Sequence, residues 1–276
     1  MKSPAYLFQK KFWLQGLLMG GLALFSMTCA TSPSGRRQLT LFSQEAMRDL
    51  GQKSFEKMKQ EQTLSENLEI NQYVQCVTNA LTAGLDPEWQ NGWEVVVFQE
   101  DSANAFALPG RRIGVHTGLL EVAKTPDQLA AVIGHEISHV QARHGNERMS
   151  QQMAAQFGLA VAAVSVDSET PSGRATLAAL GLGTQYGVLL PFSRTHESEA
   201  DQLGLHLMAQ AGFDPTQSIV LWQNMSDQNN AQPPEWMSSH PSHASRINDL
   251  KTALPEALGV QIQDKESKCV PPALTG

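Results

Sequence analysis

The chain has no excess of positive charge, few cysteines and a single long apolar run, and each shortage narrows the class of protein it can be. Its 20 Lys and Arg against 27 Asp and Glu give a net charge of −7 and a pI near 5.6, which argues against a nucleic-acid partner, since that needs a basic patch. Hydrophobic residues still make up 41% of the chain. That is enough for a core, and we predict one large folded domain.

The single long apolar run, Phe12–Phe25, lies at the N-terminus and is typical of an export signal. Three lysines precede it and small residues follow it. Its fourteen residues are too few to span a bilayer, which takes about 20. We therefore predict a signal peptide over residues 1–28. Cys29 follows at once, which predicts a lipidated lipoprotein; ordinary cleavage near Ala30, giving a soluble exported protein, is the alternative.

The chain contains three cysteines. If Cys29 carries lipid, Cys76 and Cys269 remain, and an even pair in an oxidising compartment can form a disulfide. Such a bond would hold the C-terminal segment against an early helix. Two free thiols are the alternative, because spacing alone does not show that the two side chains meet.

The segment from His135 to His139, His-Glu-Ile-Ser-His, carries the strongest chemical signal. Before it, Thr125 followed by Pro, Asp and Gln has the pattern of a capped helix start, and apolar residues follow at helical spacing. On a helix the two imidazoles share one face, where they can bind one Zn²⁺. Glu136 between them can serve as general base toward water. A core helix with two incidental histidines is the alternative.

The third ligand decides which class of zinc site is present. A metzincin would have Gly and His where this chain has Ala142 and Gly145, so that class is excluded; we expect Gly145 to end the helix instead. A carboxylate from a second helix would complete a His₂Glu set with one open position. We predict Glu197 in this role. Gly204, on the same face of its helix, would let the two helices approach closely.

The second helix should begin near Ser193 or Thr195, either of which can cap it, and end at Gly212. Asp201, one turn after Glu197, is placed to accept a hydrogen bond from the far nitrogen of a ligand histidine. Glu199 points elsewhere and is interpreted as solvated charge. An ordinary amphipathic helix with an acidic first turn is the alternative.

Together these two motifs resemble a known family. His-Glu-Ile-Ser-His followed by Ser-Arg-Thr-His-Glu-Ser-Glu-Ala-Asp (193–201) is similar to the HExxH/ExxxD signature of the CAAX prenyl protease and HtpX type, peptidase family M48. The segments at 29–39 and 104–110 and the His-Pro pair at 240–241 look like its bacterial periplasmic lipoprotein branch. The resemblance runs from Cys29 to Leu254. It implies a gluzincin fold, one Zn²⁺ per chain and endopeptidase activity.

We accordingly predict an α+β, mainly helical fold, with a small antiparallel sheet beside the helix that carries the histidines. Helices are expected at 43–60 and 65–83, a strand at 93–99 and a hairpin of strands around Pro109 and Gly110. The domain prediction is a tether at 29–42, the metalloprotease domain at 43–254 and a tail at 255–276.

By the same resemblance, the strand at 103–108 has a free edge that pairs with extended substrate, through Asn104, Ala105, Phe106 and Ala107. Backbone pairing makes little demand on side chains, so unfolded or extended polypeptides are the predicted substrates. A plain core hairpin is the alternative, and both interpretations can hold at once.

Residues 149–190 are rich in Ala and Gly and predict two small-residue helices, about 147–165 and 173–188. These helices join the two ligand helices. We expect their small residues to reflect tight packing in the core; a lid over the cleft is the alternative.

The last motif is His240-Pro with Arg246 on the helix that follows. We hypothesise that His240 lies near the metal, where it stabilises an oxyanion or blocks the open position, and that Arg246 positions or charge-stabilises the site. A His that merely caps a helix start is the alternative. Five other histidines are given no role in the site, namely His116, His144, His196, His206 and His243. For His144, two turns beyond His135, a place behind the ligands is the alternative.

The predicted function is a zinc metalloendopeptidase of the bacterial cell envelope that degrades misfolded or unassembled proteins. A latent protease acting as a chaperone or outer-membrane assembly factor is the second prediction. Ala30 is not an acidic retention signal, so by resemblance to bacterial lipoprotein sorting an outer-membrane anchor through Cys29 is expected. Any adaptor or envelope-assembly partner would be a separate chain.

Overall fold

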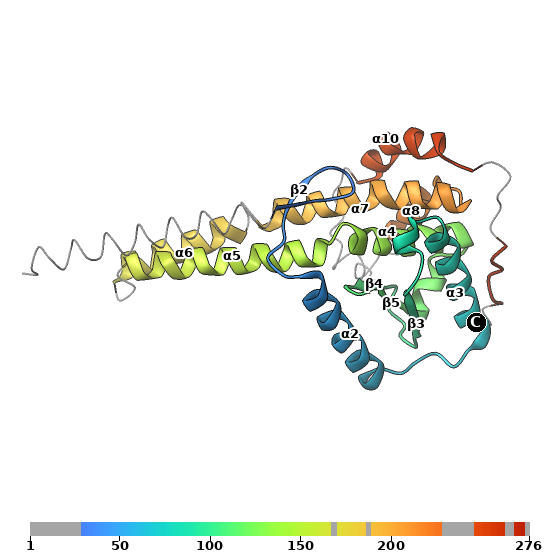
Figure 1. Cartoon of the computed structure of the whole chain (residues 1–276), viewed down its shortest axis with the longest axis horizontal. Coiled ribbons are helices and arrows are strands. Elements are labelled where there is room, and N and C mark those ends of the chain that lie inside the picture. The colour runs from blue at the N-terminus through green and yellow to red at the C-terminus, as the bar shows by residue number, and fades with distance from the viewer. Residues whose placement is uncertain (1–28, 167–169, 186–188, 228–245, 263–267, 274–276) are drawn as a thin grey trace, which may run out of the picture.

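The computed structural model describes residues 29–166, 170–185, 189–227, 246–262 and 268–273. The fold is α+β and mainly helical, as predicted (Figure 1). Its helices are α2 (Gln44–Glu61), α3 (Leu68–Ala83), α4 (Pro126–Gln141), α5 (His144–Ser165), α6 (Pro171–Thr184), α7 (Leu190–Ala211), α8 (Gln217–Asp227) and α10 (Arg246–Gly259). Short 3-10 turns lie at Pro87–Trp89 and Thr117–Glu121.

Helices α4 and α7 form the centre of the body, with α3, α8 and α10 packed around them. Gly204 lies against the backbone of α4: a Cβ on it would be 3.2 Å from the His135 nitrogen. The two helices therefore approach closely where the predicted ligands lie. The core beneath is apolar and includes Val74, Val77, Leu81, Leu129, Ile133, Ile137, Leu205 and Met208.

The three-stranded sheet has the order β3-β5-β4, built from β3 (Glu94–Phe98), β4 (Ala105–Leu108) and β5 (Arg112–His116). The predicted hairpin is confirmed: β4 runs antiparallel to β5, with Ala105 opposite Val115. The pairing of β3 with β5 is parallel, so the sheet is mixed and the prediction of an antiparallel sheet is wrong for this pair. Strand β4 is thus an outer strand of this sheet, and it packs against α4.

The start of α4 follows the predicted pattern, because the Thr125 side chain accepts a hydrogen bond from the Gln128 nitrogen. The predicted end is wrong. Helix α4 stops at Gln141 and Arg143 takes a left-handed conformation with φ 55°. Gly145 instead lies inside α5, which begins at once. A non-glycine residue at positive φ is unusual and often belongs to a functional site.

Helix α7 also begins earlier than expected, at Leu190, with Pro191 in its first turn, so the predicted caps Ser193 and Thr195 lie inside the helix. Proline is pre-organised for a first turn and extends the helix backward. The predicted end is confirmed: Gly212 has φ 87° and its N–H bonds the last turn. Helix α8 begins at Gln217, after a turn in which Asp214 accepts from the Thr216 nitrogen.

Helices α5 and α6 form an arm that extends away from the body (Figure 1). The prediction that their small residues pack in the core is wrong. Phe157 is 69% exposed and Val164 is 90% exposed. Helices α5 and α6 contact each other, but Gly158, Gly181 and Gly183 have nothing within 4 Å of where a side chain would begin, so these glycines do not mark close packing.

The segment predicted as a tether folds back on the body. Strands β1 (Cys29–Thr31) and β2 (Arg37–Leu39) pair antiparallel, and the hairpin (residues 29–39) lies across the base of the arm (Figure 1). Cys29 is the first described residue, and the predicted signal peptide lies outside the described residues.

The structure contains the Cys76–Cys269 disulfide that the sequence left open, with a Cα–Cα distance of 5.7 Å. It ties the C-terminal segment to α3. Helix α10 continues to Gly259, so the predicted domain boundary at 254 falls within a helix. Among the described helices, none combines the length and apolarity that crossing a bilayer requires.

Candidate metal centre

Three predicted metal ligands meet between α4 and α7. His135 and His139 leave α4 one turn apart, with their Nε2 atoms 3.0 Å from each other. Glu197 of α7 places its carboxylate oxygens 3.3 Å from His135 Nε2 and 3.5 Å from His139 Nε2. All three side chains are buried, and their donor atoms lie within 4.8 Å of one another. Two imidazoles and a carboxylate in this arrangement can hold one metal ion.

Behind His135 lies Asp201, whose Oδ1 is 2.9 Å from His135 Nδ1. A carboxylate only accepts, so Nδ1 carries the hydrogen and Nε2 faces Glu197. Burial acts to lower the pKa of His135, but hydrogen bonds to Asp201 and Glu197 outweigh it and raise the pKa to about 9. The site therefore favours positive charge, and a cation bound there would replace a proton.

Arg246 of α10 lies behind the ligands and does not face the cleft. Its Nη2 donates to Asp201 Oδ1 at 2.6 Å and its Nη1 to Glu197 Oε2 at 3.4 Å. The guanidinium lies over the Trp222 ring, 3.9 Å from the centroid. Burial acts to raise the pKa of Asp201, but the charge of Arg246 and the bond from His135 keep it below its usual range. Arg246 thus contacts the predicted ligand Glu197 and also Asp201, the carboxylate partner of His135.

Glu136 lies on the side of α4 that faces the sheet. Its Oε2 accepts from the Ala107 nitrogen at 3.0 Å, so the outer edge of β4 and the expected general base adjoin. Of the four residues predicted to pair with substrate, Phe106 and Ala107 line a cleft, whereas Asn104 and Ala105 are buried.

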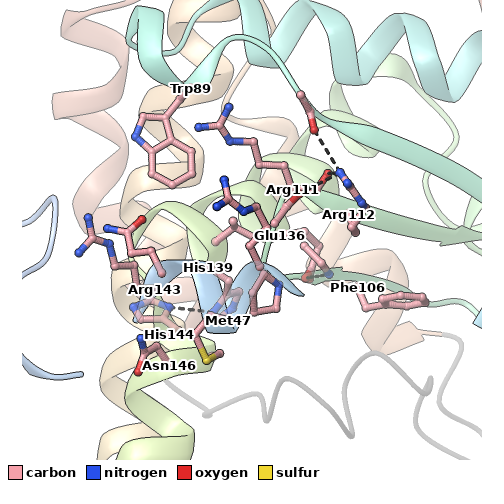
Figure 2. Close-up of a pocket in the computed structure, with 18 of the residues that line it drawn as sticks. Met47, Trp89, Phe106, Arg111, Arg112, Glu136, His139, Arg143, His144 and Asn146 are labelled. Atoms are coloured by element: carbon pink, nitrogen blue, oxygen red, sulfur yellow. Dashed lines mark hydrogen bonds between the residues drawn. The ribbon is translucent and has the colours of Figure 1, made fainter. Parts of the chain in front are cut away.

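This cleft has a volume of about 620 Å³. Glu136 and His139 lie in it beside Phe106 (Figure 2). Arginines from several elements surround it, and Arg111 stacks on Trp89 at 4.8 Å from the ring centroid. The base and one predicted metal ligand therefore line a cleft that a ligand can enter.

A second layer of polar residues lies behind His139. His144 Nδ1 is 2.8 Å from His139 Nδ1, and His144 Nε2 is 3.1 Å from Glu199 Oε2. The interpretation of Glu199 as solvated charge is wrong: it is buried, and accepts also from Ser34 and Arg36. His144, whose place behind the ligands the sequence left open, belongs to this layer. The left-handed Arg143 starts α5 at His144 and so brings this side chain to His139.

The pKa values of the titratable groups in this layer are strongly shifted. Burial lowers the pKa of His144 to about 4. Burial acts to raise the pKa of Glu199, but the bond from His144, then those from serines and Arg36, hold it well below the usual range. For Glu147, bonds from Arg36 and His196 likewise overcome burial and lower the pKa to about 2. The layer thus pairs a neutral histidine with two ionised carboxylates.

Five residues of this layer were not predicted to belong to a site, namely Arg36, Gln38, Glu147, His196 and Glu199. Their signal was weak, because they come from three separate segments. His196 is stacked on His144, with ring centroids 4.4 Å apart. His240 and His243 lie outside the described residues. His116 and His206 make local hydrogen bonds, to Ser102 and to the Gln202 carbonyl.

Comparison with known proteins agrees with this geometry. The profile named Peptidase family M48 matches residues 68–254. The mitochondrial metalloendopeptidase OMA1 of Schizosaccharomyces pombe is 38% identical over 179 residues, 64% of this chain and 50% of the relative. Metalloendopeptidase OMA1 of Danio rerio is 32% identical over 258 residues, 88% and 53%. The beta-barrel assembly-enhancing protease of Escherichia coli K12 is 32% identical over 176 residues, 62% and 36%.

Fold and ligand set therefore define a metallopeptidase domain of the gluzincin kind. The chain belongs to peptidase family M48. Its matches span about half or less of the length of these relatives.

Proposed function

We propose that this chain is a zinc-dependent metalloendopeptidase of the bacterial cell envelope that hydrolyses misfolded or unassembled proteins. The observation that carries the proposal is the convergence of His135, His139 and Glu197, with Glu136 beside them on a cleft. A His₂Glu set is typical of catalytic zinc. The names of the relatives, metalloendopeptidases and a protease, support the same chemistry.

In this proposal each residue has a defined task. His135, His139 and Glu197 would hold Zn²⁺, which when bound would supply Lewis-acid polarisation of the scissile carbonyl and acidify the attacking water. Glu136 takes a proton from that water and returns it to the leaving amine. The outer edge of β4 aligns an extended substrate by backbone pairing. Ala107 N–H, which bonds Glu136 in this structure, becomes available when substrate displaces the carboxylate.

The cellular setting is part of the proposal. The charged start and apolar run of residues 1–28, followed by Cys29, support export and a lipid anchor in the outer membrane. A soluble periplasmic protein is the alternative. The disulfide between Cys76 and Cys269 suits an oxidising compartment.

Cleavage of casein by the purified chain tests the activity. We expect hydrolysis with zinc present, loss with a chelator and recovery when zinc is restored. Glu136→Gln should bind zinc normally and lose about 10²–10⁴-fold in rate, the range expected for a general acid–base group. Cleavage by Glu136→Gln at the wild-type rate would show that the proposed mechanism is wrong.

A second candidate is a latent protease that acts mainly as a chaperone or assembly factor and binds its clients without turnover. The printed name of the beta-barrel assembly-enhancing relative favours it. Under this alternative, Glu136→Gln would prevent aggregation of an unfolded client as well as the wild type does, while neither protein cleaves it.

A further inference from the structure

Arg36 projects from the N-terminal hairpin into the layer behind the metal centre. Its Nη1 and Nη2 donate to the two oxygens of Glu147, at 2.7 Å each, and its Nε donates to Glu199 Oε2 at 2.9 Å. The Arg36 side chain is 21% exposed, whereas those of Glu147 and Glu199 are 1% and 4% exposed. One guanidinium thus forms ion pairs with two buried carboxylates, and its pair with Glu147 is bidentate.

From Glu199 the contacts continue to a predicted metal ligand. The Glu199 carboxylate only accepts, so His144 Nε2, 3.1 Å away, carries the hydrogen of a neutral imidazole. His144 Nδ1 is then an acceptor, and His139 Nδ1, at 2.8 Å, must donate to it. This leaves the lone pair of His139 on Nε2, the atom that faces His135 and Glu197.

The order of donors along this chain depends on the charge at its far end. Without a cation, Glu147 and Glu199 would be two buried carboxylates in one layer, and such groups repel each other and turn away. A displaced Glu199 no longer fixes the hydrogen on His144 Nε2. His144 could then donate from Nδ1 toward His139 and reverse the tautomer that metal binding needs.

We propose that Arg36 is a positioning residue for the metal ligand His139, acting through Glu199 and His144. The inference rests on the proposed metal site. It gives the hairpin that follows Cys29 a task beyond attachment: the hairpin sets the orientation and tautomer of a ligand on α4. The partners that Arg36 joins are 111 and 163 residues away in the chain.

Arg37 provides a matched control. It is the next residue on the same hairpin, carries the same charge and is exposed. Its contact with this layer is through its backbone carbonyl, which accepts from Arg36 Nη1 at 3.4 Å. Replacing the Arg37 side chain therefore leaves the chain of contacts intact.

The experiment measures metal binding by the full chain, separately from proteolysis. Metal-free wild type, Arg36→Ala and Arg37→Ala are titrated with Zn²⁺ against a competing chelator, and the visible spectrum of each is recorded with Co²⁺. We expect Arg36→Ala to weaken Zn²⁺ binding about tenfold, the lower end of the effect of outer ligand partners, and to change the Co²⁺ spectrum. Arg37→Ala should match the wild type, and Arg36→Lys should recover part of the affinity.

Unchanged affinity and spectrum in Arg36→Ala, with only a lower melting temperature, would overturn the inference and leave a structural ion pair. If Arg36→Ala does not fold, Glu199→Gln replaces it, since it removes the anion at nearly constant size; wild-type affinity there would overturn the inference equally. A wild type that binds zinc yet leaves casein intact would refute the endopeptidase proposal alone, because the affinities remain comparable.

Discussion

Asp201 Oδ1 lies 2.9 Å from His135 Nδ1 and 2.6 Å from Arg246 Nη2, so one carboxylate oxygen serves a predicted metal ligand and a buried cation together. Both partners depend on the negative charge of Asp201. The carboxylate accepts the hydrogen bond that fixes the tautomer of His135, and Arg246 keeps that carboxylate ionised. The consequence is that metal affinity and fold stability are linked through Asp201.

Asp201→Asn should therefore weaken zinc binding. The amide keeps the size and an acceptor oxygen but removes the charge that makes His135 a stronger ligand. We expect a loss of about 10–100-fold in affinity, measured by competition with a chelator. Asp249→Asn, at an exposed carboxylate on α10, is the control, and equal affinities in the two variants would contradict the prediction.

Arg246→Ala should destabilise the metal-free protein more than the zinc-loaded one. Without the guanidinium, Glu197 and Asp201 keep buried negative charge with less compensation, a change worth about 3–5 kcal/mol when one partner of a buried pair is removed. A bound cation supplies part of the missing charge. Denaturant unfolding with and without zinc measures the difference, with Lys251→Ala on the same helix as control. An equal loss in both states would argue against this linkage.

Gly204→Ala should separate α4 from α7. The added Cβ would meet His135 backbone atoms at 3.2 and 3.3 Å, and backbone cannot yield as a side-chain tip can. We expect lower stability and weaker zinc binding. Gly158→Ala is the matched control, because it lies in α5 with nothing within 4 Å; it should stabilise by up to about 1 kcal/mol through helix propensity. The prediction fails if the two variants behave alike.

The protein should lose stability in acid through Glu147. Its pKa is about 2 in the folded chain against an ordinary 4.5, so between these values the unfolded state binds more protons. The stabilisation is complete above about pH 4.5 and is lost as the pH falls toward 2. Urea midpoints of the wild type and Glu147→Gln across this window test it. The variant should be less stable near neutrality and depend less on pH; parallel curves would contradict the assignment.

Much of the centre could be predicted from the sequence because its residues repeat at helical spacing. His135, His139 and Glu136 come from one helix with a recognisable start, and Glu197 and Asp201 share a face of a second. The strand pair around Pro109 and Gly110 followed from the same local rules. The structure places these residues together as the spacing indicates, while their catalytic roles stay predictions.

What could not be predicted depends on contacts between distant segments. On an isolated helix Glu199 would be solvated, because the residues that bury it, Arg36 and His144, come from other elements. Arg36 is in turn held by carboxylates of α5 and α7. The start of α5 at His144 required Arg143 at positive φ, which residue type does not favour. The prediction that α5 and α6 pack in the core was wrong for a related reason. Small residues permit close packing, but the sequence does not show whether another element packs against them.

The Cys76–Cys269 bond closes a ring of chain between residues 193 apart, and α4 and α7 both lie within it. A backbone cut anywhere in that ring leaves two polypeptides that remain one molecule until the bond is reduced. Self-digestion between Cys76 and Cys269 would therefore be invisible on a non-reducing gel and would show as two fragments only after reduction. A preparation judged whole by its apparent mass on such a gel can thus already be clipped beside its own candidate metal centre.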